Sequence, residues 1–149
     1  MNNYYHKSLF NLKIDKSQIP DAGLGVYTLE PIPKDTLIDE YFGQLFTYPI
    51  GGSYVLQIDD RHCIDAINYP RCYMAMINDC SFIPKKTKKK KGKKINITPK
   101  EYYGKNNQIL EINCIFKIDS INKKGYIYSL VDIDSDSELF ISYGHDYWN

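Results

Sequence analysis

The sequence predicts a mostly β fold with short helices. Most of its apolar residues fall in short β-branched and aromatic runs, and Pro, Gly or Asp separates one run from the next. Only one stretch has helical spacing. The chain has 149 residues, of which 43% are hydrophobic, enough for one core and too few for two ordinary domains. We therefore expect residues 1–149 to form a single domain.

The expected strands follow one another along the chain, beginning with four apolar runs at 9–14, 25–29, 36–42 and 54–58. Apolar and polar residues then alternate over 110–118, which predicts a half-buried strand. A last apolar run over 126–133 predicts a further strand.

One helix and one insertion interrupt this series. Over 69–78, Cys72, Ala75 and Met76 recur at helical spacing, and Pro70 suits a first helical turn. Residues 82–108 are rich in Lys, Pro, Gly and Asn, a composition typical of an inserted loop.

Positive charge is concentrated in that loop. Eight lysines lie between Lys85 and Lys94, and although the whole chain has a net charge of +1, the remainder carries about −7. An acidic body attracts a cationic peptide, whereas the loop either contacts an anionic partner such as DNA or is solvated without a partner.

Neither a signal peptide nor an apolar run long enough to span a membrane is visible, so we expect a soluble, intracellular protein with no membrane contact. The four cysteines lack zinc-ligand spacing, so we expect reduced, mostly buried thiols at Cys63, Cys72, Cys80 and Cys114.

An acidic run near the C-terminal end is spaced like the ligands of a calcium loop, but the glycine and the terminal glutamate of such a loop are missing. We expect no metal, and either an acidic rim facing a basic substrate or a solvated turn, at Asp132, Asp134, Asp136 and Glu138.

Three separated motifs occur in a particular order: DAGLGVY at 21–27, INDC at 77–80 and ELFISYGHDYW at 138–148. Together they resemble the SET family of protein lysine methyltransferases, over nearly the whole chain, and most closely the minimal SET proteins of viruses. The resemblance implies a SET-domain β-fold with a C-terminal pseudoknot and S-adenosyl-L-methionine as cofactor. It also implies a substrate with a lysine-containing basic tail, histone tails being favoured, a possible homodimer, and a location in the host nucleus or cytoplasm if the protein is viral.

The same resemblance assigns cofactor-binding residues. Asp79 departs from the histidine of the family, whose contribution to the adenine is mainly through its backbone. From the residues alone, the glycines also suit a plain turn before a strand, and Asn78 suits a helix C-cap. The candidate cofactor-binding residues are Ala22, Gly23, Leu24, Tyr54, Asn78, Asp79 and Trp148.

Tyr143 is the candidate catalytic residue. Methyl transfer needs a neutral lysine, and because the pKa of free lysine is about 10.4, a narrow apolar channel must disfavour the ammonium form. A tyrosine hydroxyl then orients the amine. The candidate channel residues are Tyr41, Phe116, Ile141 and Tyr147.

Phe116 and Ile141 leave the channel apolar and roomy, which predicts di- or trimethylation. Tyr41 also suits a half-buried strand position, and Phe116 suits the core.

Two rival hypotheses belong to other functional classes. One is a catalytically lapsed SET fold that binds a peptide or nucleic acid, which Asp79 and the interrupted motif favour. The other is a nucleic-acid-binding protein that acts through the lysine loop. Within the enzyme hypothesis, a loop lysine is also a candidate substrate of the protein itself.

Overall fold

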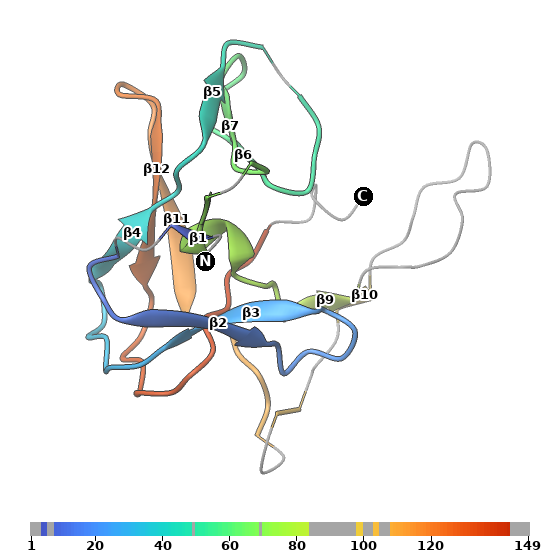
Figure 1. Ribbon diagram of the computed structural model, residues 1–149, viewed down its shortest axis with the longest axis vertical. Helices are drawn as coiled ribbons and strands as arrows, with labels where there is room; N and C mark the ends of the chain where they lie inside the picture. The colour runs from blue at the N-terminus through green and yellow to red at the C-terminus, as the bar shows by residue number, and fades with distance from the viewer. Residues whose placement is uncertain are drawn as a thin grey trace, which may run out of the picture.

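A computed structural model describes residues 4–5, 8–48, 50–68, 70–83, 98–99, 103–104 and 108–143, with the backbone alone at 4–5, 82–83 and 98–99. Over these residues the protein is built from short strands and a single 3₁₀ turn (Figure 1). The prediction of a mostly β fold is therefore confirmed. None of the helical structure in the described residues has the length and apolar character of a membrane span.

Three antiparallel sheets make up most of the structure (Figure 1). The first pairs β2 (Leu12–Lys16) with β3 (Leu24–Thr28). The second has the order β11 (Cys114–Asp119), β12 (Lys124–Ser129), β4 (Leu37–Glu40). The third has the order β5 (Gln44–Phe46), β7 (Cys63–Asp65), β6 (Val55–Gln57). The predicted runs thus contain β2, β3, β4, β6, β11 and β12 in whole or in part, whereas β5 and β7 were not predicted.

The predicted helix over 69–78 is wrong. Arg71–Cys72 forms strand β8, which pairs in parallel with β1 (Tyr4–Tyr5), and only Tyr73–Met76 forms a 3₁₀ turn, η1. Extended backbone at Cys72 and Ile77 bounds this turn on both sides. Tyr73 and Met74 are both buried, so the apolar spacing reflects a segment enclosed on several sides rather than one helical face.

Strand β11 begins four residues later than predicted because Asn113 is used elsewhere. The Asn113 side chain accepts a hydrogen bond from the Phe140 amide (2.8 Å) and donates one to the Glu138 carbonyl (3.0 Å). Leu110 and Ile112 pack beside a second, smaller core cluster. The alternation of apolar and polar residues over 110–113 therefore reflects partial burial of Leu110 and Ile112 in a segment that is not part of a β-sheet.

The predicted insertion over 82–108 lies largely outside the described residues. Within it, β9 (Phe82–Ile83) pairs in antiparallel fashion with β10 (Thr98–Pro99) (Figure 1). The chain segments on either side of the lysine run are therefore brought together. The eight lysines between Lys85 and Lys94 are not among the described residues.

The segment 138–141 lies between three parts of the fold that are distant in sequence. Leu139 donates its amide to Val26 of β3 (2.8 Å), and Ile141 donates to Asn78 (3.0 Å). Cys114 donates to Phe140 (2.9 Å). The segment thus joins strand β3, the residues that follow η1 and the start of β11. The rest of the predicted pseudoknot, 144–149, lies outside the described residues.

The main core lies where β3, β4, β12, η1 and the segment 138–141 meet. Val26, Ile38, Ile127 and Leu139 are all inaccessible to solvent there. All four cysteines are free and buried, as predicted. Burial raises the pKa of Cys72 to about 11 and the pKa values of Cys80 and Cys114 to about 12, so these thiols stay protonated at neutral pH.

Candidate active site

Both ends of Tyr143 are fixed by the short segment that follows η1. The Tyr143 hydroxyl donates a hydrogen bond to the Ile77 carbonyl, and the Tyr143 amide donates to Oδ2 of Asp79 (2.9 Å). Ile77 is buried in the main core. The ring of Tyr143 therefore has a defined position relative to η1.

Asp79 serves as a structural acceptor in this arrangement. The residue is 4% exposed. Its Oδ1 accepts hydrogen bonds from the Ser81 amide (2.7 Å) and the Ser81 hydroxyl, while Oδ2 accepts the Tyr143 amide. A buried carboxylate is tolerated when it has such donors. The aspartate that departs from the family motif thus holds the candidate catalytic tyrosine.

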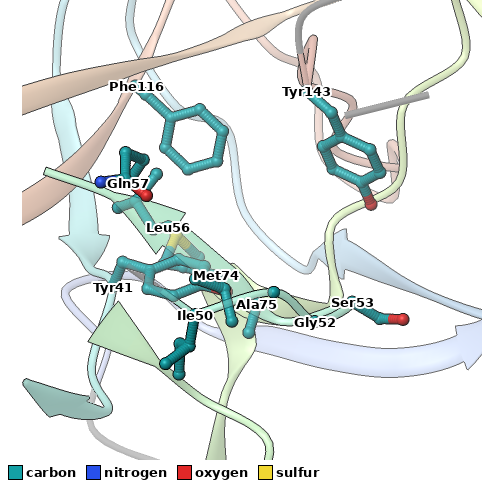
Figure 2. Close-up of a pocket in the computed structure, with 12 residues that line it drawn as sticks. Tyr41, Ile50, Gly52, Ser53, Leu56, Gln57, Met74, Ala75, Phe116 and Tyr143 are labelled. Carbon is teal, nitrogen blue, oxygen red and sulfur yellow. The ribbon is translucent and has the colours of Figure 1, made fainter. Parts of the chain in front are cut away.

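Tyr143 lies on the wall of a cavity of about 820 Å³. In Figure 2, Phe116 and Tyr41 lie on one side of this cavity and Tyr143 faces it from the other. Among the described residues, those that line it carry no formal charge: Tyr41, Ile50, Gly51, Gly52, Ser53, Val55, Leu56, Gln57, Met74, Ala75, Phe116 and Tyr143. An ammonium group entering this space gains no charged partner from the lining, so its neutral form is favoured there.

The opposite wall is held rigidly by Tyr41. Its ring meets Phe116 edge to face, with 6.2 Å between centroids. Its hydroxyl donates to the Tyr54 carbonyl (2.7 Å), and its amide donates to Gly125 of β12 (2.8 Å). These bonds join the β6 end of the cavity to the β11–β12 sheet.

Tyr54 is not among the residues that line the cavity; its carbonyl accepts the Tyr41 hydroxyl, and its ring lies against a buried arginine. The Arg71 guanidinium is 3.9 Å from the centroid of the Tyr54 ring. Arg71 also donates to the carbonyls of Ala66 (3.2 Å) and Ile67 (2.6 Å). A cation stacked on an aromatic face and bonded to two carbonyls fixes the loop after β7.

The turn from Ala22 to Leu24 lies beside the end of η1. The Asn78 side chain donates to the Leu24 carbonyl (2.9 Å), which connects the two predicted cofactor motifs directly. Gly23 has a φ of +73°, and no heavy atom of the described structure lies within 4 Å of a Cβ built there. Asn78 is not a helix C-cap, since Ile77 ends η1.

Of the remaining predicted positions, only Ile141 is among the described residues. Ile141 is 1% exposed and belongs to the main core, and the cavity lining given above does not include it. Tyr147 and Trp148 lie outside the described residues. The channel role of Ile141 and Tyr147 and the cofactor role of Trp148 stay predictions.

The predicted acidic rim needs one correction. Asp132, Asp134 and Asp136 are exposed, but Glu138 is 2% exposed and its side chain points into the protein. Its carboxylate accepts the Ser17 hydroxyl (2.7 Å) and the Gln18 amide (2.8 Å). Alternation with aspartates in sequence does not reveal such long-range contacts.

Sequence reasoning also missed part of the cavity wall. Met74 and Ala75 belong to η1, which lies within the predicted helix over 69–78. The loop 50–53 has no sequence feature beyond its glycines that would indicate a site. Leu56 and Gln57 belong to β6, a predicted strand, but nothing in their alternation indicates a cavity.

Comparison with known proteins agrees with this arrangement. The SET-domain family matches residues 23–144, and the chain belongs to that family. No curated protein matches the chain.

Two solved structures share the fold. One is described as "KRYPTONITE in complex with mCHG DNA and SAH", with a TM-score of 0.63, 20% identity and 92% of this chain covered. The other is described as "KRYPTONITE in complex with mCHH DNA, H3(1-15) peptide and SAH", with a TM-score of 0.61, 20% identity and 94% covered. The chain spans 24% and 25% of those chains. At this identity the likeness shows the SET fold.

Proposed function

We propose that this protein is an S-adenosyl-L-methionine-dependent protein lysine N-methyltransferase. Family membership supports the reaction class. The two KRYPTONITE crystals contain SAH, the product of that cofactor, and one contains an H3 peptide. Both structures therefore support the cofactor for this chain, and the second also supports a peptide substrate.

One observation supports the proposal most strongly: Tyr143, with both its hydroxyl and its amide held, lies on the wall of an uncharged cavity. The hydroxyl proton is directed to Ile77, which leaves the oxygen lone pairs able to accept an N–H from a substrate amine. A neutral amine is thereby oriented without a charged partner.

The residues present fit the cofactor. The space beside Gly23 and the contact from Asn78 to Leu24 give an open backbone surface next to the end of η1. Ala22, Gly23, Leu24 and Asn78 would hold the cofactor through this surface. When bound, S-adenosylmethionine supplies the methyl group, which is transferred from its sulfonium to the amine of the substrate.

The chain's own residues have three roles in this scheme. The uncharged lining disfavours the ammonium form and so lowers the pKa of the incoming lysine, which favours loss of its proton to solvent before methyl transfer. Tyr143 orients the resulting amine, and Tyr41 with Phe116 forms the facing wall. Positioning and desolvation of this kind account for much of the rate acceleration expected of such an enzyme.

Histone tails are the proposed substrates, because one KRYPTONITE crystal contains H3(1–15) and the chain outside the lysine run is acidic. Di- or trimethylation remains the proposed outcome, supported by Phe116, which has no hydroxyl, on the cavity wall. A homodimer and a nuclear or cytoplasmic location stay predictions.

The lapsed-enzyme alternative rests on Asp79 and on the interrupted motif. That carboxylate accepts the Tyr143 amide rather than distorting the site, which favours the active enzyme. Contact with DNA through Lys85 to Lys94 stays a separate proposal, supported by the DNA in both KRYPTONITE crystals.

The test is incubation of the protein with methyl-labelled S-adenosylmethionine and an H3 peptide, beside Tyr143→Phe. This variant keeps the ring and loses the hydroxyl. We expect label in the peptide with the wild type and at least about a hundredfold less with the variant, a barrier increase of about 2.7 kcal/mol. Absence of cofactor binding to the wild type would overturn the proposal.

A further inference from the structure

Glu138 is a buried carboxylate that the proposed chemistry does not use directly. It is 2% exposed, and its two oxygens accept hydrogen bonds from Ser17 and Gln18. Those two residues follow β2 and open the turn that leads to β3. Ser17 closes the same turn by donating its amide to the Gly23 carbonyl (2.9 Å). The carboxylate therefore holds the base of the turn that carries the candidate cofactor residues.

Gly23 in this turn and Gly25 in β3 are glycines for different structural reasons. At Gly23 the φ of +73° disfavours any residue with a side chain, although the space beside it is open among the described residues. A Cβ added at Gly25 would overlap Oε2 of Glu138 and lie 3.0 Å from its Cδ. Gly25 is therefore a glycine because Glu138 lies directly against its backbone.

Glu138 also belongs to the segment that leads to Tyr143. Its carbonyl accepts the Asn113 side chain (3.0 Å), and its backbone forms a bridge with Tyr27 of β3. The side-chain nitrogen Nδ2 of Asn78 lies 3.3 Å from the position of a Cβ built on Gly25. The carboxylate thus lies where the turn, the end of η1 and the C-terminal segment meet.

We propose that Glu138 is a positioning residue that holds the backbone from Gly23 to Gly25 in the conformation that binds the cofactor. The proposal rests on the proposed function of that turn. In this scheme Glu138 acts through Ser17, Gln18 and Gly25, and it does not touch the cofactor itself. A smaller residue at 138 leaves the base of the turn without its acceptors, and a glutamine keeps only one uncharged acceptor oxygen, so in both cases the turn departs from the binding geometry.

The experiment is a double-mutant cycle with Gly25→Ala, Glu138→Ala and the combination. The dissociation constant of S-adenosylhomocysteine is measured by calorimetry for each folded protein. Gly25→Ala alone should raise it about tenfold, because the new methyl group displaces the carboxylate; this factor corresponds to about 1.4 kcal/mol. With Glu138→Ala already present, adding Gly25→Ala should raise it less than about twofold, because the space is vacant.

Glu138→Gln keeps the size of the side chain and decides the matter if Glu138→Ala does not fold. It removes the charge that strengthens the bond from the Ser17 hydroxyl. The expected result is a rise in the dissociation constant with the KM for the peptide changed less than about twofold. Exposed Glu111→Gln is the matched control and should change neither quantity. A purely structural role would lower both affinities together and would overturn the inference.

A readout without cofactor separates the two proposals. In the free protein, Gly25→Ala should accelerate hydrogen exchange at the Gln18 amide, which the wild type protects through Glu138. Equal effects of Gly25→Ala in both backgrounds, with unchanged exchange at Gln18, would overturn the role of Glu138 alone. A wild type that does not bind S-adenosylhomocysteine would overturn the proposed function instead.

Discussion

The hydrogen bond from Tyr143 to Asp79 gives a sharp prediction, because both ends are defined and the acceptor is buried. Asp79→Ala removes the acceptor of the Tyr143 amide and of the Ser81 amide. An orphaned donor costs about 1–3 kcal/mol. Both residues are half-buried, so water partly replaces the lost acceptor and we expect a total loss of about 2–4 kcal/mol in unfolding free energy. Asp79→Asn keeps one acceptor oxygen and should cost about half as much.

The same changes should reduce catalysis through Tyr143. Asparagine has one acceptor oxygen for the Ser81 and Tyr143 amides, so the backbone of Tyr143 is held less firmly and its ring departs from the geometry that orients the amine. We expect kcat for Asp79→Asn to fall about ten- to a hundredfold, equivalent to about 1.4–2.7 kcal/mol in the barrier. Urea unfolding gives the stability, and initial rates of methyl transfer to a peptide at saturating cofactor give kcat.

Asp119→Asn is the matched control for this prediction. Asp119 also accepts backbone amides, those of Ile121 (3.1 Å) and Asn122 (3.0 Å), but it does so in the turn between β11 and β12. Its substitution should leave kcat unchanged. Unchanged kcat in a folded Asp79→Asn protein would refute the positioning role of Asp79.

Further predictions concern pH and the walls of the cavity. Burial raises the pKa of Asp39 to about 6, and its Oδ2 has no hydrogen-bond partner among the described residues. The unfolding free energy is therefore highest below pH 3.8, where the carboxyl is protonated in both the folded and the unfolded protein, and it falls as the pH rises to about 6. The unfolding free energy of Asp39→Asn should therefore exceed that of the wild type by about 2–3 kcal/mol more at pH 8 than at pH 4, and a pH-independent difference in urea unfolding would contradict this. Lys123 donates to Asp59 (2.7 Å) and its bond holds the pKa of that carboxyl below the ordinary range, so Lys123→Met should raise that pKa in an NMR titration, and an unchanged midpoint would argue against the pair. Tyr41→Phe loses the bond to the Tyr54 carbonyl and should cost about 1 kcal/mol in thermal unfolding, whereas no loss would show that water replaces the bond.

The sequence predicted the fold class because strand-forming runs and turn residues are local signals. The predicted positions of β3 and β6 are close to those observed, since both strands are apolar runs that lie near glycines or polar turn residues. The helix over 69–78 failed because pairing of Arg71–Cys72 with β1 is a contact across the chain. Tertiary pairing overrode a helical spacing that was too short to be decisive.

The candidate site shows the same division. Tyr143, Tyr41 and Phe116 were identified from sequence and line one cavity. The roles of Asp79 and Glu138 could not be predicted, because each depends on which distant donor the fold brings to the carboxylate. Asp79 was interpreted as a departure from the family motif, and Glu138 as part of a surface run. Their burial and their partners give both residues an internal structural role.

The proposed enzyme methylates a lysine amine held in the cavity beside Tyr143. The most direct measurement is mass spectrometry of an H3(1–15) peptide after incubation with the wild type and S-adenosylmethionine, beside a peptide whose lysines are replaced by arginine. We expect added mass in steps of about 14 Da, since each transfer replaces a hydrogen by a methyl group, on a lysine of the first peptide and none on the second. No added mass on the lysine peptide, from a protein that binds S-adenosylhomocysteine, would contradict it.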